Sequence, residues 1–498
     1  MIGTAPPAPS SIHRRSTSVK IDTLAALAWL SVAFGVVLRL QQRDNLPLWL
    51  DETFTGAIAS EPTWLAVARQ SFLDVSAPSY YFIAHGWGAM TSFSNDSLRA
   101  PALAFGLIGP LLCAIGMPGL TSRSRWVWLA LVALAWPAIV YSNEARTYAL
   151  LLLLAIANTL AFARLTDKYT LRNALLWGTS ASALLLTQYV ALFLLAGQGL
   201  VVLVLLRKRI FRLWPALLPM IPTLALMAFH SPRVRAFADP TVAWYPLIDI
   251  TFLPEIMNWT FGGFAGFIAL VGVCVLCAVG RVFPNPEAHH SELSTQSPWT
   301  AALAGTIGWL IFLIVCTIRP NFAPRYLIVF TPALLLGLAL LSERASLVRH
   351  YAPIAVVFLI LAQGVGYLRV DRRSLNAFEF QSGSQFLMNN DVRNVTFLWD
   401  NPSNQAEAPE QMDLVGGFFF KRAQSPASVR SIKLAQGSDP NLALTSASKE
   451  AGDGFIWVYD TNVRSTAATQ FPPRIDGALY RCHRIGGFEA AVLSCIHR

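Results

Sequence analysis

The sequence predicts a polytopic α-helical membrane protein with a small soluble domain at its C-terminal end. Hydrophobic residues make up 54% of its 498 residues and charged residues only 13%, whereas soluble proteins carry about 25% charged residues. Long apolar runs dominate residues 21–368, and residues 370–498 have an ordinary soluble composition. We therefore expect a cytoplasmic tail at 1–20, a transmembrane domain at 21–369 and a soluble domain at 370–498.

The apolar runs predict about eleven transmembrane helices, since each helix needs about 20 mainly apolar residues. The expected spans are residues 22–40, 99–118, 126–141, 147–163, 172–188, 190–206, 213–230, 259–280, 299–318, 326–341 and 351–368.

Basic residues predict how these spans are oriented. With a cytoplasmic N-terminus, every cytoplasmic loop is basic, as the positive-inside rule requires. These loops contain Arg123 and Arg125, then Arg164, Lys168 and Arg172, then Arg207 to Arg212, then Arg281, then Arg344 and Arg349. The net charge of +10 is therefore explained by membrane topology, and we expect no nucleic-acid partner because no basic stripe with interleaved aromatic residues occurs. An odd number of spans places the C-terminal domain outside.

The first external loop, residues 41–98, is long and rich in aromatic residues. It is too polar to span a membrane, and its Trp and Tyr residues suit helices that lie at the membrane surface. The loop at 231–258 has the same character. The two loops together are expected to roof a cavity at the outer membrane surface.

Adjacent carboxylates at Asp51 and Glu52 are the first candidates for chemistry. Acidic groups at a membrane boundary are costly to desolvate, so they usually pair, bind a cation or exchange protons. Either one is a candidate general base or metal ligand. The structural alternative is that Asp51 caps the helix that follows. Asp74, in the same loop, has the same two interpretations.

Apart from the long first loop, few basic residues are expected in the external loops that precede the C-terminal domain. Each basic residue found there therefore needs an explanation. Arg146 lies in an unusual turn with Glu144, and Arg325 and Tyr326 lie in a later turn on the same side. The plain interpretation is contact with lipid headgroups, a helix-end cap or a Glu144–Arg146 pair. The functional interpretation is a shared pocket for a phosphate, which the planar donors of Arg suit.

Four motifs in order resemble the bacterial branch of the membrane glycosyltransferase C superfamily. They are LWLDETFT, DVSAPSYYFIAHGW followed by LRAPALAFG, YSNEARTYALLLLL and RYLIVFTPALLL. That branch is similar to protein O-mannosyltransferases and to lipid A aminoarabinose transferases, and the resemblance covers roughly residues 20–370.

The resemblance implies a function at the periplasmic face of a bacterial inner membrane. It implies a polyprenyl-phosphate-linked sugar donor, a glycan, lipid or protein acceptor, and inversion at the anomeric carbon. The matched positions make Asp51 and Glu52 the catalytic candidates and Arg146, Arg325 and Tyr326 the donor-phosphate contacts. The supporting residues are Asp74, Tyr80, Tyr81 and Glu144.

One position departs from the family motif. Ser76 stands where the family often has His, which leaves metal dependence and acceptor class open. A divalent cation on Asp51 and Glu52 is therefore a candidate cofactor only.

Two other classes of protein share this hydropathy. A transporter is expected to show internal repeats and charged or broken helices at mid-membrane, and we find no repeat. A non-catalytic cell-envelope assembly protein with an external domain is the second alternative.

The C-terminal domain is expected to be a small α/β domain of about 120 residues. Its last segment predicts two strands joined through Gly486 and Gly487. Cys482 and Cys495 flank that turn, so a hairpin brings them opposite each other, and an oxidising compartment allows a disulfide. The alternative is two free thiols, which the opposite topology requires.

Overall fold

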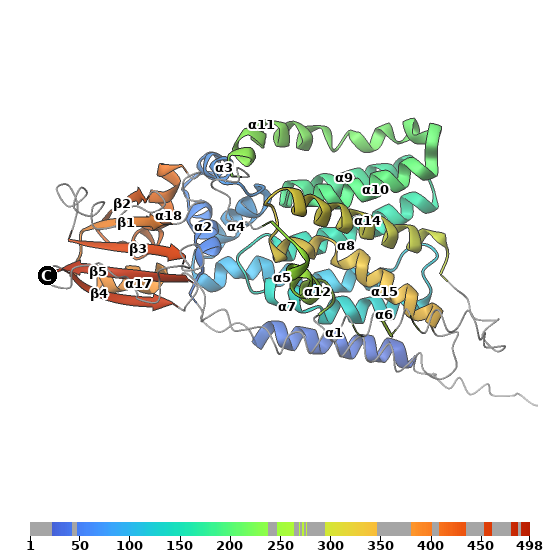
Figure 1. Ribbon diagram of the computed structural model, residues 1–498, viewed down its shortest axis with the longest axis horizontal. Helices are drawn as coiled ribbons and strands as arrows, with labels where there is room; N and C mark the ends of the chain where they lie inside the picture. The colour runs from blue at the N-terminus through green and yellow to red at the C-terminus, as the bar shows by residue number, and fades with distance from the viewer. Residues whose placement is uncertain are drawn as a thin grey trace, which may run out of the picture.

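The computed structural model joins a helical bundle to a five-stranded sheet through a layer of short helices (Figure 1). The structure describes residues 22–41, 47–237, 247–262, single positions between 268 and 275, and then 294–345, 380–400, 408–434, 453–460, 480–486 and 490–498.

Ten helices of mainly apolar sequence form the bundle among the described residues. They are α1 (Thr23–Gln41), α5 (Asn95–Ile115), α6 (Ser122–Leu134), α7 (Trp136–Tyr141), α8 (Tyr148–Asp167), α9 (Leu171–Thr187), α10 (Ala191–Leu206), α11 (Ile221–Phe237), α14 (Gln296–Ile318) and α15 (Thr331–Ala345). Within the described residues, α1, α5, α8 and α14 are long and apolar enough to cross a membrane, and α10 is a shorter apolar helix. The prediction of a polytopic helical membrane protein is confirmed. The eleven-span count stays a prediction, because residues 351–368 and most of 259–280 lie outside the described residues.

Proline and short 3-10 turns move three of the expected boundaries. The span expected at 126–141 is two helices, which break at Ala135 just before Pro137. The segment Arg207–Leu217 is a 3-10 helix with Pro215 inside it, so α11 begins at Ile221 rather than near 213. Another 3-10 helix, η4 (Pro324–Val329), precedes α15. A proline lacks the backbone N–H that a helix interior needs, so hydropathy alone places these ends wrongly.

The region between α1 and α5 contains three short helices, α2 (Leu50–Ala59), α3 (Trp64–Leu73) and α4 (Ser79–Met90). A side-chain cap marks the start of α3, where the Thr63 hydroxyl accepts from Ala66 N–H. On α3, Trp64 and Leu65 are 55% and 80% exposed, so this helix presents an apolar face outward. Such a helix suits a membrane surface.

The C-terminal domain is a mixed sheet with the strand order β2-β1-β3-β5-β4. Its strands are β1 (Asn394–Asp400), β2 (Ser428–Lys433), β3 (Gly454–Asp460), β4 (Tyr480–Gly486) and β5 (Ala490–His497). β1 runs parallel to β2 and β3, and β5 runs antiparallel to β3 and β4. Parallel neighbours need a crossover, which α18 (Pro409–Arg422) supplies between β1 and β2, and α17 (Phe380–Met388) precedes β1.

The two faces of the sheet bury different side chains. Strand residues alternate between faces, so Phe397, Trp399 and Ile456 pack with α17 and α18. Phe455 and Cys495 belong to a separate small cluster on the other face. Only the first face is continuous with the loop helices α2 and α4.

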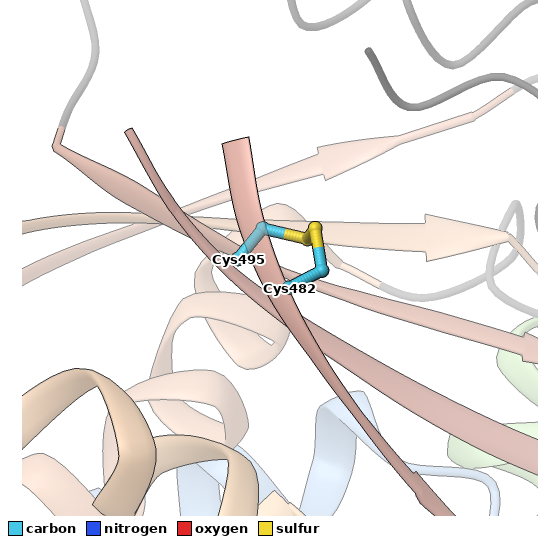
Figure 2. Close-up of a disulfide and its surroundings, with 2 residues drawn as sticks. All are labelled: Cys482 and Cys495. Carbon is cyan, nitrogen blue, oxygen red and sulfur yellow. A yellow bond between two sulfur atoms is a disulfide. The ribbon is translucent and has the colours of Figure 1, made fainter. Parts of the chain in front are cut away.

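A disulfide joins the last two strands. Cys482 pairs with Cys495 in the antiparallel register of β4 and β5, and their sulfur atoms are bonded (Figure 2). The turn after Gly486 that was expected to join the strands lies outside the described residues.

Candidate active site

The carboxylates Asp51 and Glu52 lie in the first turn of α2, a helix between the bundle and the C-terminal domain (Figure 1). Trp49 occupies the N-cap position, and its backbone N–H donates to Glu52 Oε2 at 3.3 Å. Asp51 is therefore not the helix cap, which corrects the structural alternative for this residue. The two adjacent side chains point into different surroundings.

Asp51 stands between two arginines that are distant in sequence. Its Oδ2 atom lies 3.7 Å from Arg146 Nη2 and 3.5 Å from Arg325 Nη2. The atom is buried, yet it accepts no hydrogen bond from the described residues. A carboxylate oxygen held by charge alone keeps its lone pairs for another hydrogen-bond donor.

Glu52 has the opposite environment, because several hydrogen-bond donors surround its carboxylate. Arg99 donates to both carboxylate oxygens at 2.7 Å, and the backbone N–H of Ala145 donates to Oε1 at 2.8 Å. Glu52 is only 1% exposed. This residue therefore ties α2 to α5 and to the turn that contains Arg146.

Arg146 connects the first loop to the turn between α7 and α8. Its guanidinium donates to the Asp51 carbonyl at 3.1 Å and to the hydroxyls of Thr55 and Ser76, both at 3.4 Å. Burial lowers the pKa of Arg146, but Asp51 and the other acidic groups around it together outweigh that effect and raise the pKa above its usual value. Arg146 is a fixed cation, and its guanidinium faces Asp51.

Glu144 lies in the same turn and is fully buried. Its backbone carbonyl accepts from Arg146 N–H at 2.7 Å. The structure therefore brings Glu144 beside the site as a buried part of the turn.

Asp74 and Tyr81 form a second polar group at the site. The Tyr81 hydroxyl donates to the Asp74 carboxylate in a short hydrogen bond, and both residues are buried. Burial and the Asp74 charge raise the pKa of Tyr81 well above its usual range, so the phenol stays protonated as a donor. Tyr80 points elsewhere and donates to the Leu98 carbonyl at 3.4 Å.

The position of the family His is occupied by Ser76, which accepts from Arg146. The histidine nearest to Ser76 in sequence is His85, on α4. Its Nδ1 lies 2.8 Å from the Ala59 carbonyl, and its ring packs edge-on against Trp64 at 4.4 Å.

Arg325 and Tyr326 lie on η4. The Arg325 guanidinium is 5.8 Å from the ring centre of Trp49 and 6.0 Å from that of Tyr326, within the range of cation–π attraction. Aromatic faces therefore help to hold the second arginine beside Asp51.

A cavity of about 350 Å³ adjoins this charged group. Ser76 and Tyr326 line the cavity and connect it to Arg146 and Arg325. Its other walls are mainly apolar and come from α10, α11 and the segment after α9. They include Val190, Leu192, Phe193, Met227, Val234 and Phe237.

A metal centre needs several converging ligands. Among the described residues, no group of three or more His, Cys, Asp or Glu side chains could hold a metal ion. Arginines engage both Asp51 and Glu52, so this pair does not fit a divalent cation.

Arg99 and Thr55 belong to the site although the sequence predicted no role for them. Arg99 was visible in the motif LRAPALAFG as a cation at the start of an apolar span, which is an expensive place for a charge. Thr55 gave no sequence signal, because its contact with Arg146 depends on how α2 packs.

Two solved structures share this arrangement of elements. They are ArnT from Cupriavidus metallidurans in the apo state and the same protein bound to undecaprenyl phosphate. Each aligns with a TM-score of 0.52 and 14% sequence identity, over 94% of this chain and 98% of that chain. No family model and no curated protein matches the sequence. At 14% identity these matches show the fold alone, and they confirm the fold that the resemblance implied.

Proposed function

We propose that this protein is a glycosyltransferase that moves a sugar from a polyprenyl phosphate to an acceptor. The observation that carries the proposal is the position of Asp51 Oδ2, buried between Arg146 and Arg325 beside an apolar cavity. A proton acceptor, two cations and an apolar space are the three features that this reaction needs.

The proposed reaction is a single displacement. Asp51 takes the proton of an acceptor hydroxyl or amine while the acceptor atom bonds to the anomeric carbon. The bond from that carbon to the phosphate oxygen breaks, and the phosphate leaves with the electron pair. Displacement from the opposite face inverts the anomeric carbon. Preorganised cations stabilise the charge that develops on the leaving phosphate, which is the role of Arg146 and Arg325.

The cavity supports the choice of donor. A polyprenyl chain needs an apolar space next to a cationic site for its phosphate, and Tyr326 borders both. The ArnT structure with undecaprenyl phosphate supports the same ligand class. The sugar is a hexose or pentose, and the acceptor is a glycolipid, a polysaccharide or a protein.

The other site residues hold the catalytic and phosphate-binding residues in position. Glu52 positions α2 and the Arg146 turn, and Tyr81 and Asp74 support Ser76 beside them. We derive no step through a metal, since Asp51 and Glu52 are engaged by arginines.

The location that fits this reaction is a bacterial inner membrane, with the N-terminus cytoplasmic and the C-terminal domain periplasmic. The domain packs directly on the first-loop helices, so the two share one side of the bundle. That arrangement supports an odd number of spans.

The test uses a deletion strain and purified protein. Mass analysis of surface glycolipids, polysaccharides and proteins in the deletion strain is expected to show one missing sugar, restored by wild type and not by Asp51→Asn. Purified protein in lipid discs is expected to bind undecaprenyl phosphate. A strain with every glycan intact, together with no binding, would favour the non-catalytic assembly role, and movement of a substrate across sealed vesicles would favour a transporter.

A further inference from the structure

The C-terminal domain packs against the helix that contains Asp51. Phe54 of α2, Phe418 of α18 and Phe397 of β1 belong to one continuous hydrophobic core. The contact lies between the sheet and the bundle, where α2 and α18 lie side by side (Figure 1). The outer domain is therefore built into the catalytic region.

Helices α2 and α18 approach each other closely at Gly56. A Cβ atom at this position would lie 2.8 Å from Phe418 Cζ and 3.1 Å from Leu98 Cδ1, so the contact leaves no room for a side chain. The Phe418 ring cannot easily move away, because Phe419 packs against it at 5.0 Å and the Arg422 guanidinium lies 5.2 Å from its centre.

Polar contacts surround this apolar centre. Arg69 pairs with Glu410 at 2.8 Å, and Lys421 pairs with Glu61 at 3.4 Å. Arg69, Glu410 and Lys421 are about half exposed or more, and exposed ion pairs contribute only about 0–1 kcal/mol. The Gly56–Phe418 packing therefore sets how closely the two helices approach.

We propose that α18 fixes the place of Asp51 through Gly56 and Phe418, which act as positioning residues. This inference rests on the proposed function. Helix α2 has 10 residues, and helices of that length have little stability alone. Glu52 holds its first turn, and Phe418 holds its middle, about 7.5 Å further along the helix axis from Asp51. These two points set the distance from Asp51 to both arginines.

The first test is Gly56→Ala. Alanine favours helix more than glycine does, so lost activity cannot come from a weaker helix. The added methyl group pushes α2 away from Phe418, and misplacement by about 1 Å can cost about 100-fold in rate. We expect kcat to fall by about that factor at saturating donor, with a much smaller change in undecaprenyl phosphate affinity.

The second test is rescue. Phe418→Leu removes Cζ, the atom that the new methyl group meets. The double variant Gly56→Ala/Phe418→Leu is therefore expected to regain most of the lost kcat, as coupled neighbours do in a double-mutant cycle. A double variant as slow as the product of the single effects would overturn the proposal.

A matched control lies on the other face of the sheet. Phe455 is buried in the same domain but belongs to the separate cluster, so Phe455→Leu is expected to lower Tm without lowering kcat per folded molecule. If kcat in Gly56→Ala stays at the wild-type value, or falls only in step with Tm as in Phe455→Leu, the positioning role is wrong.

Hydrogen exchange separates this inference from the proposed function. Amides of residues 50–59 are expected to exchange faster in Gly56→Ala than in wild type, and to return in the double variant. If wild type transfers no sugar, the proposed function fails, while the exchange pattern still decides whether α18 holds α2. Unchanged exchange would overturn the inference by itself.

Discussion

The two sides of the first turn of α2 place the same chemical group in opposite surroundings. On one side, Asp51 Oδ2 has two cations at 3.5 and 3.7 Å and accepts no hydrogen bond from the described residues. On the interior side, the Glu52 carboxylate accepts three hydrogen bonds of 2.7–2.8 Å. A saturated carboxylate holds structure together, and one held by charge alone is available to react. The difference assigns separate roles to neighbours that look alike in sequence.

The largest expected effect is that of Asp51→Asn on sugar transfer. The amide keeps the shape of the side chain but cannot accept the acceptor proton. Loss of a general base lowers rates by about 10²–10⁴-fold, and we expect a change in this range with nearly unchanged Tm. The measurement is the initial rate of transfer by purified protein.

The control for this variant is Asp96→Asn, an exposed carboxylate in the first turn of α5, which should leave the rate unchanged. If Asp51→Asn keeps more than about a tenth of the wild-type rate, the base role is rejected, because so small a loss of rate falls below the range for a catalytic base.

The next largest effect is expected from the two arginines beside Asp51. Arg146→Ala and Arg325→Ala should each weaken binding of undecaprenyl phosphate by about tenfold or more, since a hydrogen bond to a charged group contributes about 1.5–3 kcal/mol. Lysine at either position should restore binding only in part, because it lacks the planar pair of donors.

Native mass spectrometry or competition binding measures these affinities in lipid discs. Arg319→Ala is the matched control, as this arginine is exposed at the end of α14. Unchanged affinity in both alanine variants contradicts the phosphate role.

Glu52→Gln is expected to lower the rate of transfer less than Asp51→Asn does, and to lower the stability more. It leaves Arg99 mostly buried beside an uncharged partner. Breaking a buried ion pair costs about 3–5 kcal/mol, so thermal unfolding should shift far more than in Asp51→Asn. Arg99→Met in the same background removes the stranded cation and should recover part of the loss. A stable Glu52→Gln protein with no transfer would move the catalytic role to Glu52.

Hydropathy and charge predicted much of the fold, because a membrane demands long apolar helices and sorts basic residues by side. Arg146 and Arg325 were conspicuous in the sequence because basic residues were expected to be rare in those loops. The two arginines are far apart in the sequence, and both lie beside Asp51. A charge in an unfavourable place is a signal that sequence alone can show.

Packing determined what sequence could not predict. Asp51 and Glu52 are equally plausible catalytic residues in LWLDETFT, and only the turn of α2 directs Glu52 toward Arg99 and Asp51 toward Arg146 and Arg325. Gly56 gave no signal either, since its importance comes from Phe418, which is distant in the chain. The 3-10 helix before α11 was missed because hydropathy does not register the backbone effect of Pro215.

The smallest expected effect on transfer comes from the far edge of the outer domain. Cys482 and Cys495 join β4 and β5 on the sheet face that does not pack with α18 (Figure 2). Replacing both with serine should destabilise the domain by roughly 2–3 kcal/mol, as expected for a short closed loop. The rate of transfer per folded molecule should not change, because the contact between α18 and α2 is preserved.

Thiol alkylation with and without reductant, read by mass spectrometry on the C-terminal peptide, reports the bond in the native protein. Labelling should require reductant if the domain lies in the periplasm as proposed, because that compartment is oxidising. Rapid labelling of both cysteines without reductant would contradict the disulfide, and activity of a cytoplasmic reporter fused at the C-terminus would contradict the topology. A double-serine variant that loses stability and transfer together would instead mean that the whole outer domain, rather than its α18 face alone, holds Asp51 in place.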